Sequence, residues 1–135
     1  EGEAPVGWIG AGYPWYGIQT TEHQAVLKAY KERFNDHPRL GSVVGYTAIH
    51  SLAAGLRKAG GSDTEKLIAA FKGLEVTSPF GPIRYRPEDH QSTMGAFVGR
   101  TRLQNGVGAM SDFRYLDGAR FQPPAEEVRK LRAAE

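Results

Sequence analysis

Apolar side chains recur every three or four positions along three successive stretches of the chain. The first stretch begins at Thr21, where Gln24 completes a capping-box pattern, and it ends at His37-Pro38. Its apolar positions fall on one helical face, whereas the charged residues fall elsewhere. The spacing predicts an amphipathic helix whose inner face carries Val26, Leu27, Tyr30 and Phe34.

Two more helices are predicted directly after the first. Over residues 42–59 apolar side chains recur at intervals of four, and Gly60-Gly61 supply a stop signal, so this longer helix is expected to be largely buried. Ser62 and Glu65 form another capping box, for a shorter helix that Gly73 closes. The expected inner positions are Val43, Val44, Ala48, Ile49, Leu52, Ala53 and Leu56 in the longer helix and Leu67, Ile68 and Phe71 in the shorter one.

Two short stretches of the chain predict single strands. Residues 6–13 are apolar and Gly-rich, which is typical of a buried strand, and Pro14 stops any helix from running through them. Further along, Ile83 and Tyr85 alternate with arginines, as in a half-buried strand.

A hairpin is predicted near the C-terminus. The apolar stretches 94–103 and 107–115 flank Asn105-Gly106, the dipeptide that most strongly favours a two-residue hairpin turn. These stretches should therefore pair as antiparallel strands.

The last predicted element is a charged helix that starts at Ala125 after Pro123-Pro124, with Val128 and Leu131 as weak docking positions. The resulting order is one strand, three helices, late strands and a final helix. It predicts an α/β protein, but it does not alternate as a self-contained doubly wound sheet requires. The chain is therefore expected to be a piece of a larger fold.

Composition narrows the possible chemistry. The 135 residues are 40% apolar and 24% charged, as in an ordinary globular protein, and contain no cysteine, which excludes disulfides, thiolate metal sites and cysteine nucleophiles. The formal net charge of +2 gives no reason to expect a nucleic-acid partner. No apolar window is long enough to cross a bilayer, and the first residues lack the pattern of a signal peptide.

The four histidines share no metal-ligand spacing, so neither a metal nor a cofactor is predicted. His23 and His37 are expected to be exposed residues at helix ends, and His50 a partly buried helix residue. The string Glu88-Asp89-His90 could suggest acid-base chemistry, but adjacent residues after a proline are typical of a turn.

A series of local motifs stands in a recognisable order. It comprises Gly12-Tyr13-Pro14-Trp15-Tyr16, a helix end at Arg33-Phe34 with Pro38 beyond it, Gly45-Tyr46-Thr47-Ala48, Ala59-Gly60-Gly61 and residues 80–91, Phe-Gly-Pro-Ile-Arg-Tyr-Arg-Pro-Glu-Asp-His-Gln. In this order the chain resembles the C-terminal part of the branched-chain amino-acid type of periplasmic solute-binding protein, the receptor of ABC importers. The resemblance covers nearly the whole chain and corresponds to roughly the last third of such receptors.

The resemblance implies a two-lobed type I periplasmic-binding-protein fold, in which three segments cross between α/β lobes and the ligand lies in the cleft. Residues 1–16 would then form a strand and crossover of the second lobe, residues 17–92 the helical segment and a strand of the first, and residues 93–135 the hairpin and C-terminal helix of the second. Hinge positions would fall at Pro14 and Gly17 and at Gln91, Ser92 and Thr93. A plain loop would explain either stretch as well.

Two groups of residues are candidates for ligand binding. Tyr13, Trp15 and Tyr16 form the densest aromatic cluster, beside a proline and glycines, where rings could cover an apolar ligand; alternatively they fill the core at a strand end. The second group opens the long helix, where free amides could hold a carboxylate, although an ordinary helix cap explains it too. It comprises Gly41, Ser42, Val43, Gly45 and Tyr46.

The resemblance implies an exported receptor, periplasmic or extracellular, without a catalytic residue. Its ligand would be a branched-chain or other amino acid, or a related aromatic carboxylate, and its partners a membrane permease and the missing N-terminal part of the same receptor. Two alternatives stay open. One is a hydrolase-type enzyme fragment that uses Asp89 and His90. The other is an oligomerising structural module that pairs with copies of itself through faces the missing part would cover.

Overall fold

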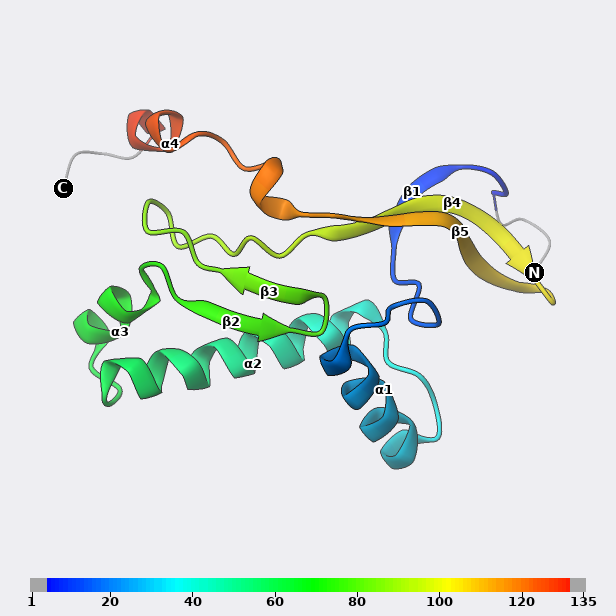
Figure 1. The fold of residues 1–135 in the computed structure, drawn as a ribbon, viewed down its shortest axis with the longest axis horizontal. Helices are drawn as coiled ribbons and strands as arrows, with labels where there is room; N and C mark the ends of the chain where they lie inside the picture. The colour runs from blue at the N-terminus through cyan, green and yellow to red at the C-terminus, as the bar shows by residue number, and fades with distance from the viewer. Residues whose placement is uncertain (1–4, 132–135) are drawn as a thin grey trace.

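Two small sheets and four α-helices make up the computed structural model, which describes residues 5–131 (Figure 1). The mixed α/β class predicted from the sequence is confirmed. The elements are β1 (Ile9–Gly12), α1 (Thr21–Phe34), α2 (Leu40–Ala59), α3 (Thr64–Phe71), β2 (Glu75–Ser78), β3 (Gly81–Arg84), β4 (Ala96–Gln104), β5 (Val107–Leu116), the 3-10 helix η1 (Gly118–Arg120) and α4 (Ala125–Leu131).

The larger sheet is antiparallel with the strand order β1-β4-β5. The predicted hairpin is confirmed: Asn105 (φ 53°) and Gly106 (φ 76°) both adopt the left-handed conformation that a type I′ turn requires, and Gln104 pairs with Val107. The register shifts between Val98 and Arg100, where a bulge interrupts the β4–β5 ladder. The sheet therefore combines an early strand with two late ones.

The smaller sheet contains only β2 and β3, paired antiparallel from Glu75↔Arg84 to Ser78↔Gly81. The sequence predicted the second of these strands but missed β2, whose four residues are too few to show a period. Ser78 closes the connection, because its hydroxyl donates to the carbonyl of Gly81 (2.7 Å) and accepts from the amide of Phe80 (3.2 Å). This pair of strands lies along α2 and α3 in Figure 1.

The three helices occur where predicted, but their caps differ. The N-cap of α1 is Thr20 rather than Thr21, and its hydroxyl accepts from the amide of His23 (3.2 Å). The N-cap of α3 is Asp63 rather than Ser62. Two predictions about burial in α1 were wrong: His23 is fully buried, whereas Phe34 is exposed at the last turn.

The buried face of α2 shares Val43 with the predicted face but otherwise differs from it. Small and polar residues at intervals of four are inside, and their hydroxyls donate to carbonyls one turn earlier, so no buried donor is lost. Gly55 admits the ring of Phe71, since a Cβ there would lie 2.4 Å from that ring. The apolar stripe faces outward instead, with Ile49 67% exposed, so the expectation of a largely buried helix was wrong. The buried residues are Val43, Thr47, Ser51 and Gly55, and the exposed stripe contains Val44, Ile49 and Leu52.

The hydrophobic core joins the helical part of the chain to the larger sheet. Val43 of α2 and Phe80 of the β2–β3 connection pack with Ile18 and with Phe97 of β4. The rings of Phe80 and Phe97 meet edge to face, with centroids 5.1 Å apart. Tyr13, Met94, Phe113 and Tyr115 surround this cluster.

The C-terminal segment returns along the connection between β3 and β4 (Figure 1). The side-chain amide of Gln122 donates to the carbonyl of Ser92 (2.8 Å), and the guanidinium of Arg86 donates to the carbonyl of Pro123 (2.8 Å). Of the two predicted docking residues in α4, Val128 is buried and Leu131 is exposed. Over residues 5–131, no helix has the length and apolarity needed to cross a membrane.

Candidate functional site

Two adjoining hollows open where three segments of the chain meet: the turn after β1, the connection between α1 and α2, and the β4–β5 hairpin. Their volumes are about 390 Å³ and 660 Å³, within the range of small-molecule sites. We call them together the junction pocket. Residues that line both hollows are Trp15, Tyr16, His37, Arg39, Arg102, Gly108 and Ala109.

Tyr13 lines the inner hollow, and its hydroxyl lies 2.7 Å from Nε2 of His23 on α1. Burial raises the pKa of Tyr13 to about 12. Burial also lowers the pKa of His23, and a backbone hydrogen bond with Ile18 opposes that shift. Both side chains are therefore neutral near pH 7, and the pair fastens the turn after β1 to the first turn of α1.

Trp15 contacts two basic side chains. Its ring stacks on the imidazole of His37 with centroids 4.6 Å apart and an interplanar angle of 25°. The ammonium of Lys31 lies 4.6 Å from the centre of the same ring, a cation–π distance. The indole is therefore fixed in orientation where it lines both hollows.

The hydroxyl of Tyr16 is bound to the backbone of β5. It donates to the carbonyl of Met110 (2.8 Å) and accepts from the amide of the same residue (2.6 Å). This arrangement uses both hydrogen-bonding functions of the hydroxyl, so Tyr16 offers its ring, rather than a free polar group, to the pocket.

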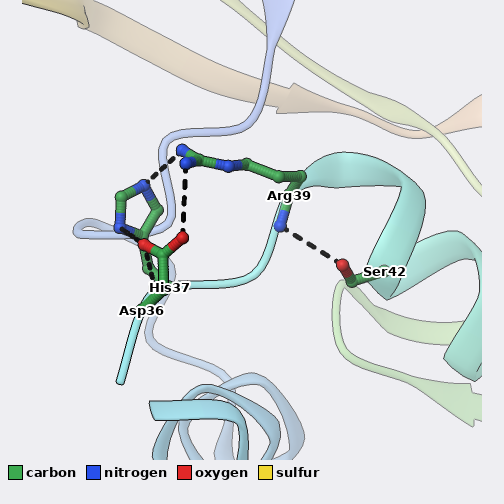
Figure 2. Close-up of polar contacts among 4 residues, drawn as sticks. All are labelled: Asp36, His37, Arg39 and Ser42. Atoms are coloured by element: carbon green, nitrogen blue, oxygen red, sulfur yellow. Dashed lines mark hydrogen bonds and ion pairs between the residues drawn. The ribbon is translucent and has the colours of Figure 1, made fainter. Parts of the chain in front are cut away.

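The wall opposite the hairpin is a short polar network, drawn in Figure 2. The guanidinium of Arg39 contacts Nε2 of His37 (2.7 Å) and the carboxylate of Asp36 (3.4 Å). Because a guanidinium has no acceptor, Nε2 of His37 must accept, which leaves the proton on Nδ1, 3.1 Å from the Asp36 carboxylate. The network fixes the tautomer of His37 and aims Arg39 along the pocket wall.

The second group of candidate residues lies at the start of α2, outside the lining of the junction pocket. The hydroxyl of Ser42 accepts from the amide of the N-cap residue Arg39 (3.4 Å), as the N3 residue of a capping box does (Figure 2). Val43 is fully buried in the core, and Tyr46 stacks on His50, which is exposed rather than partly buried, with centroids 4.0 Å apart. A Cβ added at Gly41 or Gly45 would meet no atom within 4 Å. A contact between this group and a ligand stays a prediction.

The first predicted hinge is a tight turn. Pro14 is fully buried, and its carbonyl accepts from the amide of Gly17 (2.9 Å). Gly17 lies against Phe113 of β5, since a Cβ at this position would be 2.3 Å from the end of that ring. The turn therefore requires a glycine for close packing.

The second predicted hinge is tied to its neighbours by hydrogen bonds. Thr93 exchanges bonds with the backbone of Arg84, and the hydroxyl of Ser92 accepts from the amide of Met94 (3.1 Å). Gln91 accepts through its carbonyl from the amide of Arg86 (2.9 Å). Motion at either hinge stays a prediction.

Asp89 and His90 lie in the predicted turn. The carboxylate of Asp89 contacts the guanidinium of Arg86 (3.3 Å) and accepts from the amide of Gln91 (3.0 Å), both within the same loop. His90 follows in the left-handed conformation, with φ 57°. Among residues 5–131, no group of three or more acidic, histidine or cysteine side chains is placed to hold a metal ion.

Sequence reasoning identified the aromatic part of the pocket and missed its basic part. Arg39 follows a proline, and Arg102 lies in a strand next to other polar residues, so neither carries a local signal of function. His37 was expected to be an exposed residue, but its ring is partly covered by Trp15. Only the fold brings these side chains to one pocket.

Comparisons with known proteins identify the family of the chain. A family model described as a periplasmic binding protein matches residues 3–106. The chain is similar to the structure of an ABC-type branched-chain amino acid transporter from Rhodopseudomonas palustris CGA009, with 27% identity and a TM-score of 0.78 over 89% of this chain and 33% of that one. No curated protein matches the chain significantly.

Two further solved structures extend the comparison. A solute binding protein of an ABC transporter from Rhodopseudomonas palustris BisB5, in complex with 3,4-dihydroxybenzoic acid, is 30% identical with a TM-score of 0.71, over 87% of this chain and 32% of that one. A leucine binding protein from Thermotoga maritima MSB8 shares the fold at 22% identity and a TM-score of 0.67, over 83% of this chain and 32% of that one. The chain thus spans about a third of the length of each of these proteins. It belongs to the periplasmic binding protein family.

Proposed function

We propose that this chain is the C-terminal portion of an exported receptor that captures a small carboxylate-bearing solute between two lobes and delivers it to a membrane permease. The solute is a branched-chain or other amino acid, or a related aromatic carboxylate. The receptor acts in the periplasm or outside the cell, and the remainder of its cleft comes from the N-terminal part of the same protein.

The junction pocket carries this proposal. It lies between the helical part of the chain and the three-stranded sheet, where aromatic and basic side chains from both parts meet. A carboxylate suits the basic side chains, and an apolar or aromatic body suits the rings. Trp15 and Tyr16 would enclose the ligand body, with Tyr13 behind them.

In this proposal the two parts of the chain belong to different lobes. Residues 1–16 and 93–135 contribute to the second lobe and residues 17–92 to the first, with hinges at Pro14 and Gly17 and at Gln91, Ser92 and Thr93. The two sheets support this division, because each contains strands from only one of the two parts. Closure of the lobes would bring the hairpin wall toward the α1–α2 wall.

Binding without chemistry is the role we infer for the site. The solved proteins to which the chain is similar are named as transporter components, and the contacts of Asp89 explain that residue as part of a turn. This favours a structural role for Asp89 and His90 over the hydrolase alternative.

Isothermal titration calorimetry of the full-length natural protein tests the receptor proposal. Branched-chain amino acids, amino-acid amides and aromatic acids are titrated in turn, and at least one is expected to give saturable heat. Saturation by none of these classes would refute the proposal.

Self-association of the 135-residue chain is a second candidate property. The outward stripe of α2, with Val44, Ile49 and Leu52 exposed, is an apolar face of the kind that associates in water. In the receptor proposal the N-terminal part of the protein covers this face. Without that part, two copies of the chain would pair through it.

A further inference from the structure

The junction pocket is positively charged. Its lining includes the guanidinium groups of Arg39 and Arg102. Among the described residues, neither hollow is lined by an aspartate or a glutamate. The potential inside therefore favours an anionic ligand and opposes an ammonium group.

The two arginines differ in how far their charge is already compensated. Arg39 contacts the carboxylate of Asp36 at 3.4 Å and the ring of His37 at 2.7 Å. Arg102 on β4 donates to the neutral side-chain oxygen of Gln104 (2.7 Å), and within residues 5–131 it forms no ion pair. Since a guanidinium has five N–H donors, Arg102 retains donors and a full charge for a ligand.

The rest of the lining contains aromatic and apolar side chains beside the polar residues Thr101, Gln104 and Asn105. The indole of Trp15 is held by its stack on His37, and the ring of Tyr16 is held by its two bonds to Met110. Ala109 and Val107 of β5 complete the hairpin side. Rings fixed in this way can pack against the ring of an aromatic ligand without moving, and ring pairs gain energy beyond their buried area.

We infer that the ligand is an aromatic monocarboxylate without an ammonium group, and that Arg102 is the residue that binds its carboxylate, with Arg39 reinforcing the charge from the opposite wall. This inference rests on the proposed function and selects one ligand class within it. A zwitterionic amino acid would place its ammonium near two guanidinium groups, and no carboxylate in the described lining balances that charge. A guanidinium, in contrast, matches a carboxylate with two parallel hydrogen bonds.

The test uses calorimetry on the full-length natural protein with four probes: benzoate, the neutral benzamide, L-leucine and L-phenylalanine. Benzoate is expected to bind at least about tenfold more tightly than benzamide, because only the anion gains charge-assisted hydrogen bonds. Both zwitterions should bind more weakly than benzoate. Raising the salt concentration should weaken the binding of benzoate and leave the binding of benzamide nearly unchanged.

Two variants of Arg102 and one control variant test the role of this residue. Arg102→Gln should lower the affinity for benzoate by about ten- to a hundredfold and change the affinity for benzamide by less than about threefold. Arg102→Lys keeps the positive charge and should recover part of the lost affinity for benzoate. Arg57→Gln is the matched control, because it removes one exposed positive charge near the C-terminal end of α2, outside the lining of the pocket. It should leave both affinities unchanged.

The outcomes separate this inference from the proposed function. If leucine or phenylalanine binds and benzoate does not, the ligand class is wrong and the receptor proposal stands. If no amino acid, amide or aromatic acid binds, the receptor proposal itself fails. If benzoate binds as tightly to Arg102→Gln as to the natural protein, the assignment of Arg102 is overturned; circular dichroism of the variant confirms that this comparison is made on folded protein.

Discussion

Replacing Tyr16 with phenylalanine should loosen the attachment of the turn after β1 to the outer edge of β5. Hydrogen-bonded and non-hydrogen-bonded residue pairs alternate along an antiparallel hairpin, starting with the hydrogen-bonded pair Gln104↔Val107 next to the turn. Thr101↔Met110 is therefore a non-hydrogen-bonded pair, and the N–H and C=O of Met110 point away from β4. The same holds for Thr101, because its backbone groups form hydrogen bonds with Gly7 and Trp8, on the side away from β5. The hydroxyl of Tyr16 therefore satisfies backbone groups that the sheet leaves free.

The structure sets the size of the effect. Tyr16→Phe removes two hydrogen bonds, of 2.6 Å and 2.8 Å, and each contributes about 0.5–1.5 kcal/mol net. The side chain is 39% exposed, so water can replace part of the loss. We expect the local opening free energy at Met110 to fall by about 1–2 kcal/mol, which corresponds to roughly five- to thirtyfold faster exchange of its amide proton.

Amide hydrogen exchange followed by NMR on the full-length natural protein measures this directly. Tyr46→Phe is the matched control, because that tyrosine is similarly exposed (38%) and its hydroxyl forms no hydrogen bond within residues 5–131. The control should leave exchange at Met110 unchanged. If the amide of Met110 in Tyr16→Phe exchanges within a factor of two of the natural protein, the hydroxyl does not protect this strand edge and the reasoning is wrong.

Three further predictions concern stability and association. His23 has a lowered pKa when folded, so the unfolded chain takes up its proton first; stability should be fully present above the ordinary value of 6.5 and decline as pH falls below it. His23→Gln should flatten that decline in urea titrations between pH 8 and 5, while exposed His50→Gln should not; an equally steep decline in His23→Gln would contradict the assignment. Gly95→Ala should cost about 3 kcal/mol or more in denaturation experiments, because its Cβ would lie 1.8 Å from the carbonyl oxygen of Leu116, whereas Gly41→Ala, with open space around it, should cost nothing; equal stability of the two variants would argue against this close backbone contact. Sedimentation velocity should show the isolated 135-residue chain associating and Ile49→Lys reducing that association; a monomer at high concentration would exclude the α2 stripe as an association face.

Local signals in the sequence were enough to predict the hairpin and the existence of the helices. Asn105-Gly106 determines its turn without help from distant residues, because both positions need the left-handed conformation that these residues accept. The cap of α1 was misplaced by one residue because Thr20 and Thr21 offer the same hydroxyl. The four-residue strand β2 is too short to show an alternation of apolar and polar residues.

The composition of the pocket depended on contacts that a linear pattern cannot show. Tyr13, Trp15 and Tyr16 stood out because they are adjacent in the sequence, and the fold places all three in the lining of one pocket. Arg39 and Arg102 come from distant segments, and only the approach of the hairpin to the α1–α2 connection brings them together. His23 looked like an exposed residue because its partner, the hydroxyl of Tyr13, comes from another element.

The misjudged face of α2 has a physical explanation in the proposed receptor. A hydrophobic stripe at helical spacing predicts burial against something, but not against a particular partner. The contacts of this helix within the chain instead use its other face, where small residues such as Gly55 allow Phe71 to approach closely. A helix with small buried residues on one side and exposed Ile49 and Leu52 on another is built for contacts on both sides. The solved proteins that the chain resembles are about three times as long, so our proposal places the second partner of α2 in the N-terminal part of the receptor.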